Sequence, residues 1–484
     1  MVSNLSLRLP GATIRRFSAL LVAVLAGCVS VGPDYHAPAS IAPTGWQAVP
    51  LDGMVAGGSA DLSRWWEQLA DPLLSSLIDE ALQANPDLKR AAAALRGARA
   101  SRDLASANRF PTVNASSGVT RSTSLGAART LYQAGFDASW EPDVFGGTRR
   151  ALEAADADLD ASLADLRSTR VSLVAEVALN YVELRAYQSR LAIARDNLES
   201  QSETLQITDW RAQAGLVSAL DVEQARSNRD TTRAQVPALD TGRAGAEHRL
   251  AILLGRTPGS LHARLDTPGS GQMPALPASV ALSIPAEALR QRPDVQAAER
   301  RLAAETARVG QAEAARYPRF SLSGSIGLEA LGLSTLSGGG QIARSLAGAV
   351  SGPVFDAGRL RAGVAAQDAL REQALAAYDK AVLAALEDVQ NALVALASSR
   401  ERQQALASAA DAARNAALLA RHRYSSGLID FQTVLSTERS LLTIEDSLAS
   451  AEAERVTALI QLYKALGGGW SPADSALQSI GKAS

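Results

Sequence analysis

Residues 132–140 read Tyr-Gln-Ala-Gly-Phe-Asp-Ala-Ser-Trp, with an apolar side chain at every second position. The alternation returns at residues 320–328, which read Phe-Ser-Leu-Ser-Gly-Ser-Ile-Gly-Leu. Because successive side chains of a strand point to opposite faces of a sheet, each segment predicts a strand with one apolar and one polar face. The pattern fits a strand that faces lipid from a membrane barrel, and it equally fits a half-buried strand of a soluble sheet.

Each of these strands has a weaker neighbour in the sequence. Residues 112–121 and 342–354 predict the partner strands, and loops rich in Ser, Gly and Arg (121–130 and 332–341) separate the pairs. Four strands cannot close a barrel, since about eight is the smallest number seen. Open sheet edges are not tolerated in lipid. If the strands span a membrane, the protein must therefore form a cyclic oligomer that shares one barrel.

The strands belong to a unit that occurs twice. The offset between matching residues rises only from 207 to 212 along the chain. Four ordered matches carry the repeat: Asn85-Pro86-Asp87-Leu88 with Arg292-Pro293-Asp294-Val295, Arg109-Phe110-Pro111 with Arg316-Tyr317-Pro318, Val144-Phe145 with Val354-Phe355, and Ala214-Gly215-Leu216-Val217 with Ser426-Gly427-Leu428-Ile429. Pro86 and Pro293 suit a first helical turn, so each copy begins with a helix there.

Very long helices follow the strands in both copies. We expect them near 148–210 and 358–424, and then near 216–254 and 430–466. Apolar residues recur four and three apart, which is typical of coiled coils. A single amphipathic helix on a globular core is disfavoured, because a helix of about 65 residues measures roughly 100 Å at 1.5 Å per residue.

The composition agrees with helices packed through small side chains. Aromatic residues make up only 4% of the 484 residues, although 47% are hydrophobic. The net charge of −2 argues against nucleic acid as a partner. One cysteine and four isolated histidines exclude a disulfide within the chain and predict no metal site. No catalytic or phosphate-binding motif occurs, so we expect neither an enzyme nor a bound cofactor.

The N-terminus has the pattern of a targeting segment. Residues 1–27 carry three arginines and no acid, and they end in a short apolar run that is followed by Cys28. Leu25-Ala26-Gly27-Cys28 resembles the lipobox of bacterial lipoproteins, in which the cysteine becomes the lipidated first residue. Val29 is not the aspartate of an inner-membrane retention signal, which favours the outer membrane. No later segment has 18 uninterrupted apolar residues, so no transmembrane helix is predicted.

Taken together, these motifs resemble the TolC family of outer membrane factors, in its lipidated branch typified by OprM and NodT. The matching motifs are Cys28, Trp65-Trp66, the Pro-Asp and Phe/Tyr-Pro pairs, residues 354–359, residues 423–427 and residues 462–470. The resemblance implies a mainly α fold with a small β part. Long coiled-coil helices form a periplasmic α-barrel, and each protomer of a homotrimer gives four strands to one twelve-stranded outer-membrane β-barrel.

The resemblance also implies a function and partners. Family members are passive exit ducts of tripartite efflux pumps, which export drugs and other small toxic compounds. They dock a periplasmic adaptor and an inner-membrane pump, usually of the resistance-nodulation-division type, and their barrel faces outer-membrane lipid. On this basis we expect a lipid-anchored protein of the outer membrane that extends into the periplasm.

The repeat and the resemblance divide the chain into six expected segments. These are a lipoprotein signal peptide (1–27), an N-terminal equatorial segment (28–84), a first repeat (85–255), an equatorial linker (256–284), a second repeat (285–467) and a C-terminal tail (468–484).

The turns between paired long helices are the expected periplasmic tips. The family implies that acidic residues just past the second turn ring the entrance, but Thr433 and Ser436 occupy those positions here. We expect Asp221 and Asp430 to form or flank the gate instead; the alternative is that they cap helix starts, where acids are favoured. The residues expected to dock the adaptor are Gly215, Leu216, Gly427 and Leu428.

Two other functions remain open from the sequence. The chain could be an outer-membrane duct for type I protein secretion, which would differ in cargo but not in mechanism. A structural periplasmic coiled-coil lipoprotein or an adaptor would instead contain no barrel strands.

Overall fold

The computed structural model describes residues 30–39, 54–56, 62–124, 127–266, 271–277, 280–282, 292–334 and 341–471. The chain divides into two compact units. The first unit contains the described parts of 30–39, 95–163 and 297–379, and the second contains those of 54–94, 164–296 and 380–471. The predicted signal peptide (1–27) and Cys28 lie outside the described residues.

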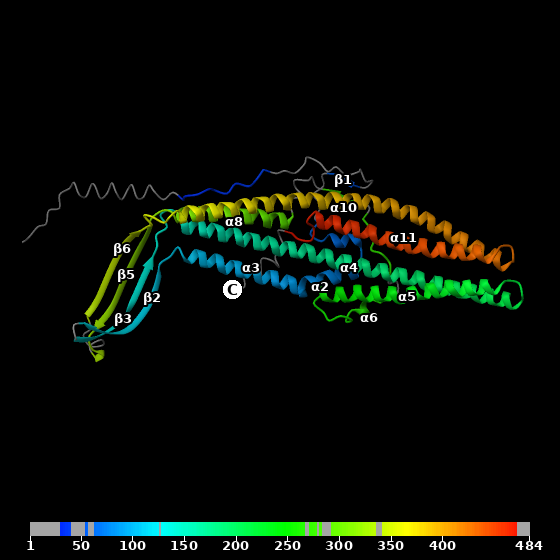
Figure 1. The fold of residues 1–484 in the computed structure, drawn as a ribbon, viewed down its shortest axis with the longest axis horizontal. Helices are drawn as coiled ribbons and strands as arrows, with labels where there is room; N and C mark the ends of the chain where they lie inside the picture. The colour runs from blue at the N-terminus through cyan, green and yellow to red at the C-terminus, as the bar shows by residue number, and fades with distance from the viewer. Residues whose placement is uncertain are drawn as a thin grey trace, which may run out of the picture. The chain divides into compact units, whose positions relative to one another are not determined.

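The first unit contains one antiparallel sheet of four strands in the order β2-β3-β5-β6 (Figure 1). The strands are β2 (Thr112–Ser124), β3 (Ala127–Trp140), β5 (Arg319–Ala330) and β6 (Gln341–Ser351). All four predicted strands are confirmed, and β3 pairs with β5 to join the two hairpins. The first hairpin loop is shorter than the expected 121–130, because β2 and β3 stay paired up to Ser124 and Ala127.

The strand register separates the sheet into two faces. Phe136 pairs with Ala115 and Ile326, and Ile326 pairs with Arg344, so these four side chains share one face. This apolar face also carries the following residues: Val113, Val119, Tyr132, Ala134, Ala138, Trp140, Phe320, Leu322, Leu328, Ile342, Leu346 and Val350. Many of them are exposed, including Leu346 at 80% and Phe136 at 59%.

The opposite face, the polar face, is tied by hydrogen bonds between strands. Ser116 donates to Asp137 at 2.7 Å, and Gln133 donates to Glu329 at 3.0 Å. The register places these residues on the face away from Phe136. The sheet therefore has one polar face and one apolar face, as the sequence predicts, and many side chains of the apolar face are exposed among the described residues.

The helices show the duplication in their lengths. α4 (Gly147–Gln213) and α10 (Arg359–Ser425) each have 67 residues, and α5 (Ala219–Leu253) and α11 (Phe431–Ala465) each have 35. α3 (Pro86–Ala107) and α8 (Pro293–Ala314) each have 22 residues and begin at the predicted prolines.

The helices α3 and α8 end slightly before the predicted Phe-Pro and Tyr-Pro junctions. The N–H of Phe110 bonds to the carbonyl of Ala107, and the N–H of Tyr317 bonds to that of Ala314. These bonds span three residues, so the last turn of each helix tightens before its proline.

The second unit has an apolar core that contains the Trp65-Trp66 pair. Trp65 and Trp66 belong to a short helix η1 (Trp65–Leu69) and are at most 1% exposed. The Trp65 ring stacks on that of Tyr463 at 5.2 Å. α2 (Pro72–Ala84) joins this core, and α6 (His262–Leu265) and the parallel strands β1 (Met54–Ala56) and β4 (Val280–Leu282) complete the described elements.

Among the described helices, α10 alone is long and apolar enough to pass the criteria for a membrane span, with a mean hydropathy of 1.3 over 18 residues. Only 28% of that stretch is buried. A helix whose apolar side meets a neighbouring chain passes the same test, so composition does not make α10 a span.

Candidate functional site

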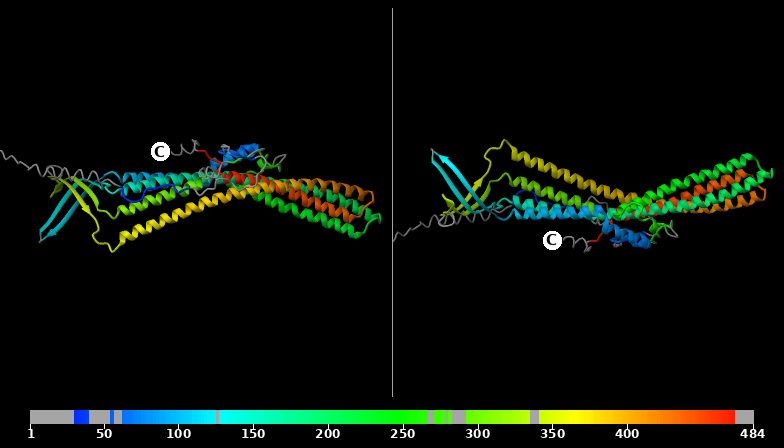
Figure 2. Two further views of the ribbon diagram at one scale, coloured as in Figure 1. Left: turned by 90° about the horizontal axis from the view of Figure 1, so that it is seen from above. Right: turned by 90° about the horizontal axis from the view of Figure 1, so that it is seen from below.

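The predicted tips are two matching turns in the second unit. Gly215 (φ +71°) and Gly427 (φ +75°) have the left-handed conformation that favours glycine at a helix end. The N–H of Leu216 bonds to the carbonyl of Arg211 at 2.9 Å, and the N–H of Leu428 bonds to that of Arg423 at 2.8 Å. Two views show the α4–α5 and α10–α11 turns side by side (Figure 2). The structure thus brings the four predicted docking residues to one end of the unit.

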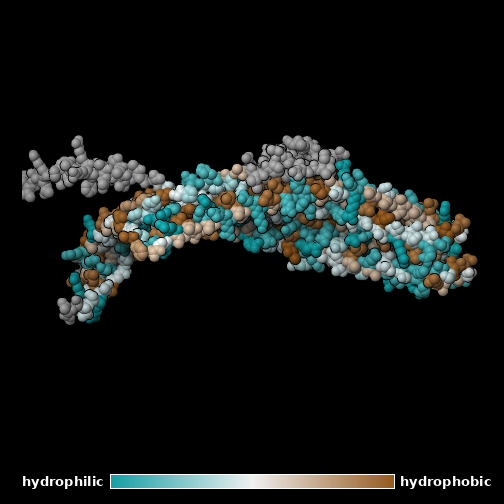
Figure 3. Space-filling view, turned by 45° about the horizontal axis from the view of Figure 1, so that its top comes forward, coloured by the Kyte–Doolittle hydropathy of each residue, from teal (hydrophilic) through white to brown (hydrophobic). Residues whose placement is uncertain are grey.

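These turns expose apolar side chains. Leu216 is 67% exposed and Leu428 is 74% exposed, and Leu220 and Trp210 lie nearby with 64% and 59%. Apolar residues gather at this end in the space-filling view (Figure 3). Exposed apolar clusters of this kind mark interaction sites.

The two acids expected at the gate begin the returning helices. Asp430 is the N-cap of α11, where one carboxylate oxygen accepts from the N–H of Thr433 at 3.0 Å and from its hydroxyl at 2.7 Å. These bonds lower the pKa of Asp430. Asp221 completes a capping box with Ser218 at the start of α5. Each acid uses one oxygen in capping, as the alternative hypothesis expects, and both residues lie at the turns.

A polar cluster behind the turns was not anticipated from the sequence. The hydroxyl of Tyr424 lies 3.3 Å from that of Thr208, and the Arg211 guanidinium donates to the carbonyl of Tyr424. The guanidinium carbon of Arg211 lies 4.5 Å from the centroid of the Tyr424 ring. These contacts tie the end of α4 to the end of α10.

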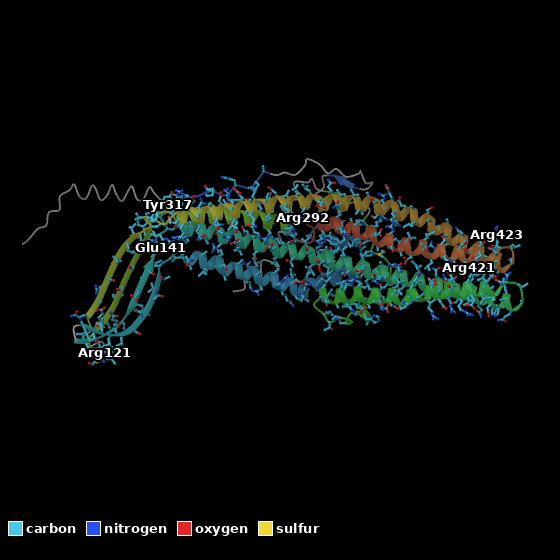
Figure 4. All side chains as sticks on the ribbon, in the orientation of Figure 1. Arg121, Glu141, Arg292, Tyr317, Arg421 and Arg423 are labelled. Atoms are coloured by element: carbon cyan, nitrogen blue, oxygen red, sulfur yellow. The ribbon has the colours of Figure 1, made fainter. Side chains whose placement is uncertain are left out.

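A buried acid extends the cluster to α11. Glu438 is 2% exposed and accepts from the hydroxyl of Thr204 at 2.7 Å. Arg421 approaches the same carboxylate at 3.4 Å without hydrogen-bond geometry. Burial raises the pKa of Glu438, and the bond from Thr204 and the charge of Arg421 only partly oppose this. Arg421 and Arg423 lie near the tip of α10 (Figure 4). In the sequence, residues 423–427 belong to the motifs that resemble the family, but no pattern there assigns a contact to Arg421 or Tyr424.

The residues that follow Cys28 are held against the first unit. The N–H of Val31 bonds to the carbonyl of Phe145 at 3.2 Å. Arg150, whose side chain is 5% exposed, donates to the carbonyls of Val31 and Gly32 and to Asp34 at 2.7 Å. The segment thus docks between the end of β3 and the start of α4, because Phe145 lies between these elements.

Two glycines make close contacts that fix this docking. A Cβ added at Gly32 would lie 2.3 Å from the Cα of Gly310, and one added at Gly146 would lie 2.5 Å from the hydroxyl of Ser30. Among the described residues, no group of three or more His, Cys, Asp or Glu side chains is placed to hold a metal ion.

Within the part of the chain that the structure describes, the four-stranded sheet has two unpaired edges and an exposed apolar face, and it is joined to long coiled-coil helices. This combination is typical of an oligomeric channel of the outer membrane. The family model for the outer membrane efflux protein matches residues 77–256 and 284–468, and the chain belongs to this family.

Relatives and solved structures agree with this assignment. Outer membrane protein OprJ of Pseudomonas aeruginosa is 33% identical over 463 residues, which cover 94% of this chain and 95% of OprJ. The probable outer membrane lipoprotein SilC of Salmonella typhimurium is 29% identical and covers 94% of this chain and 99% of its own length. The structure of the outer-membrane channel OprN has a TM-score of 0.84 at 39% identity and covers 91% of this chain and all of its own.

The family confirms the fold, the class of function and the location. The chain is a mainly helical channel protein whose four strands contribute to a shared trimeric barrel. It is a non-enzymatic efflux duct of the outer membrane that extends into the periplasm. The apolar, mostly exposed stretch of α10 fits a helix that meets a neighbouring protomer.

Proposed function

We propose that the chain is the passive exit duct of a tripartite efflux pump, with a periplasmic adaptor and an inner-membrane pump of the resistance-nodulation-division type as partners. The observation that carries this proposal is the pairing of an incomplete membrane-type sheet with 67-residue helices in each of two repeats. The duct supplies no energy, so the pump selects drugs or other small toxic compounds. Leu216 and Leu428, presented by Gly215 and Gly427, form the apolar surface that docks the adaptor.

Complementation in the native host tests the export function. Deleting the gene is expected to increase susceptibility to dyes, detergents and several antibiotics, and the intact gene is expected to restore resistance. Unchanged susceptibility together with the loss of a secreted protein would instead support a type I secretion duct. If neither export nor secretion changes, the proposal fails.

We further propose that Cys28 carries the lipid anchor. Cys28 lies outside the described residues, but Val31 follows it by three residues and is bonded to Phe145. Val31 is held at the β3–α4 junction, and only two residues separate it from Cys28 in the sequence. Cys28→Ala tests the anchor: we expect the unaltered protein to incorporate a labelled fatty acid and this variant to incorporate none. Including the variant in the complementation shows whether export needs the anchor.

The gate proposal places Asp221 and Asp430 at the entrance as a ring of six carboxylates in the trimer. At the N-cap position of Asp430, asparagine caps a helix as well as aspartate does, whereas alanine does not. At the third helical position of Asp221, an asparagine side-chain oxygen can still accept from the N–H of Ser218, which alanine cannot do. Asp221→Asn and Asp430→Asn therefore remove only the charges. We expect both to reduce cation selectivity in single-channel recordings. We also expect blockade by multivalent cations to weaken by about fivefold for each charge removed.

The matching alanine variants separate the two roles. If capping is the only role of the acids, the asparagine variants will conduct like the unaltered channel, and only Asp221→Ala and Asp430→Ala will differ. That result would remove both acids from the gate.

A further inference from the structure

The apolar face of the sheet carries two positive charges, Arg121 on β2 and Arg344 on β6. Arg344 pairs with Ile326, and Arg121 lies two residues beyond Val119 on the same face. Both arginines are exposed. Neither guanidinium has a hydrogen bond or ion pair to any residue that the structure describes. A charge on a lipid-facing position of a barrel costs about 2–4 kcal/mol at the midplane and little near the interface, so their depth matters.

Both arginines lie near the hairpin ends of the sheet. Arg121 is three residues from the end of β2 and Arg344 is three residues from the start of β6, or about 10 Å at 3.3 Å per residue. Arg121 lies at the end of the sheet opposite Glu141 and Tyr317, where the helices begin (Figure 4). Since the helices extend into the periplasm, the arginines lie at the level of the outer leaflet.

No acid of the four strands or of their hairpin loops lies on the same face to neutralise these charges. The strand acids Asp137 and Glu329 lie on the polar face. The hairpin loops 125–126 and 331–340 contain no aspartate or glutamate in their sequence. A neighbouring protomer of the trimer contributes the same strands and the same loops, so it offers no acid here either.

An apolar hollow adjoins Arg344. It has a volume of about 520 Å³, and its lining on this face includes Phe136, Ile326, Leu328 and Ile342. Ile326 pairs with Arg344 across the strands, and Ile342 precedes Arg344 by two residues on the same face. A positive charge beside an apolar depression matches a molecule that has an anionic head and an acyl chain.

Closure of the barrel brings the two arginines to neighbouring strands. β2 and β6 are the two edges of the sheet, so in the trimer β6 of one protomer lies beside β2 of the next. We propose that Arg344 and the neighbouring protomer's Arg121 bind the phosphate of an outer-leaflet lipid whose acyl chain lies in the hollow. Arginine suits this role because its planar guanidinium binds phosphate in a bidentate manner. Three such sites occur per trimer, one at each seam between protomers.

Native mass spectrometry of the full-length trimer in mild detergent tests the proposal. The added probes are lipid A with its phosphates, its dephosphorylated form, and inorganic phosphate. We expect up to three phosphorylated lipids to stay bound to the trimer. The double variant Arg121→Gln/Arg344→Gln is expected to reduce this binding at least fivefold. The matched control is Arg129→Gln, which removes an exposed charge from the polar face of the same hairpin and is expected to change nothing.

Three results would overturn the proposal. They are equal binding of the dephosphorylated lipid, full displacement of the lipid by inorganic phosphate, and an equal loss of binding in the Arg129→Gln control. Migration of each variant as a trimer in gel electrophoresis of unheated samples shows that the variant is assembled. The export function does not depend on this site, so susceptibility measurements distinguish failure of this proposal from failure of the duct.

Discussion

Replacing Arg292 by methionine is expected to lower the free energy of unfolding by about 2–3 kcal/mol. The Arg292 side chain is 10% exposed and reaches Asp294 at 2.6 Å, Asp388 at 3.0 Å and the carbonyl of Ala465 at 3.1 Å. The Arg292 guanidinium thus joins three helices: the start of α8 at Asp294, the middle of α10 at Asp388 and the last residue of α11, Ala465. Removing Arg292 leaves both carboxylates without their cation, and breaking a buried ion pair destabilises a protein strongly. We expect a loss at the lower end of the usual range because the two carboxylates are about half exposed to solvent.

The acid dependence of stability gives this prediction a second readout. Burial raises the pKa of Asp294, but the hydrogen bond and charge of Arg292 outweigh burial and lower it. A lowered pKa contributes stability above the ordinary value near 3.8, and that contribution is lost as the pH falls through the folded-state pKa. The unaltered protein should therefore lose more stability than Arg292→Met upon acidification below about pH 4.

The first repeat provides the control for Arg292. Arg90 and Asp87 form an exposed ion pair at 3.2 Å, with side chains that are 82% and 66% exposed. Arg90→Met should change the melting temperature of the trimer little, since exposed pairs contribute at most about 1 kcal/mol. Equal melting of Arg292→Met and Arg90→Met, measured by circular dichroism in detergent, would show that the Arg292 cluster does not stabilise the fold.

Gly32→Val is expected to release the segment that follows the predicted lipid anchor. Gly32 has φ +91°, and a Cβ at this position would lie 2.3 Å from the Cα of Gly310. The left-handed backbone alone costs a valine about 1–3 kcal/mol, and the overlap with a backbone atom forces the segment away from α8. The Arg150 bonds to Val31, Gly32 and Asp34 are then lost with it.

Hydrogen exchange followed by mass spectrometry measures this release. Residues 30–39 should lose protection in Gly32→Val, including the Val31 amide that bonds to Phe145. Gly358→Val is the matched control, because Gly358 has φ +86° but no atom within 4 Å of an added Cβ. Protection of residues 30–39 that survives in Gly32→Val would contradict the docking argument.

Part of the site was not predicted because its contacts join residues that are far apart in the sequence. Arg292 in the second repeat takes the place of Asn85 in the first, and both reach the last residue of a returning helix: Asn85 donates to the carbonyl of Leu253 at 2.9 Å. The sequence shows that the two positions correspond, but it does not show what they contact. The same holds for Glu438 and Thr204, whose bond joins helices from different repeats.

The acids at the tips show a different limit. Their positions just past Gly215 and Gly427 follow from the repeat, and a capping role for them is also visible in the sequence because it uses neighbouring residues. Whether their free oxygens line an entrance depends on three chains around an axis. A single sequence carries no pattern for that arrangement.

By itself, the sequence determined the strands and the long helices of the two repeats and their order, but it did not predict η1, α2, α6, β1 or β4. Two-residue alternation defined β3 and β5, while β2 and β6 followed from weaker patterns beside them. Apolar residues four and three apart defined the long helices, and prolines and glycines marked element ends, because these signals depend on backbone geometry within a few residues. Only the tertiary structure decided that Arg150 holds the segment after Cys28 and that Arg292 joins three elements. It also decided that Arg121 and Arg344 share an apolar face on which the four described strands carry no acid. These features depend on strand register and on packing between distant residues, which local periodicity does not encode.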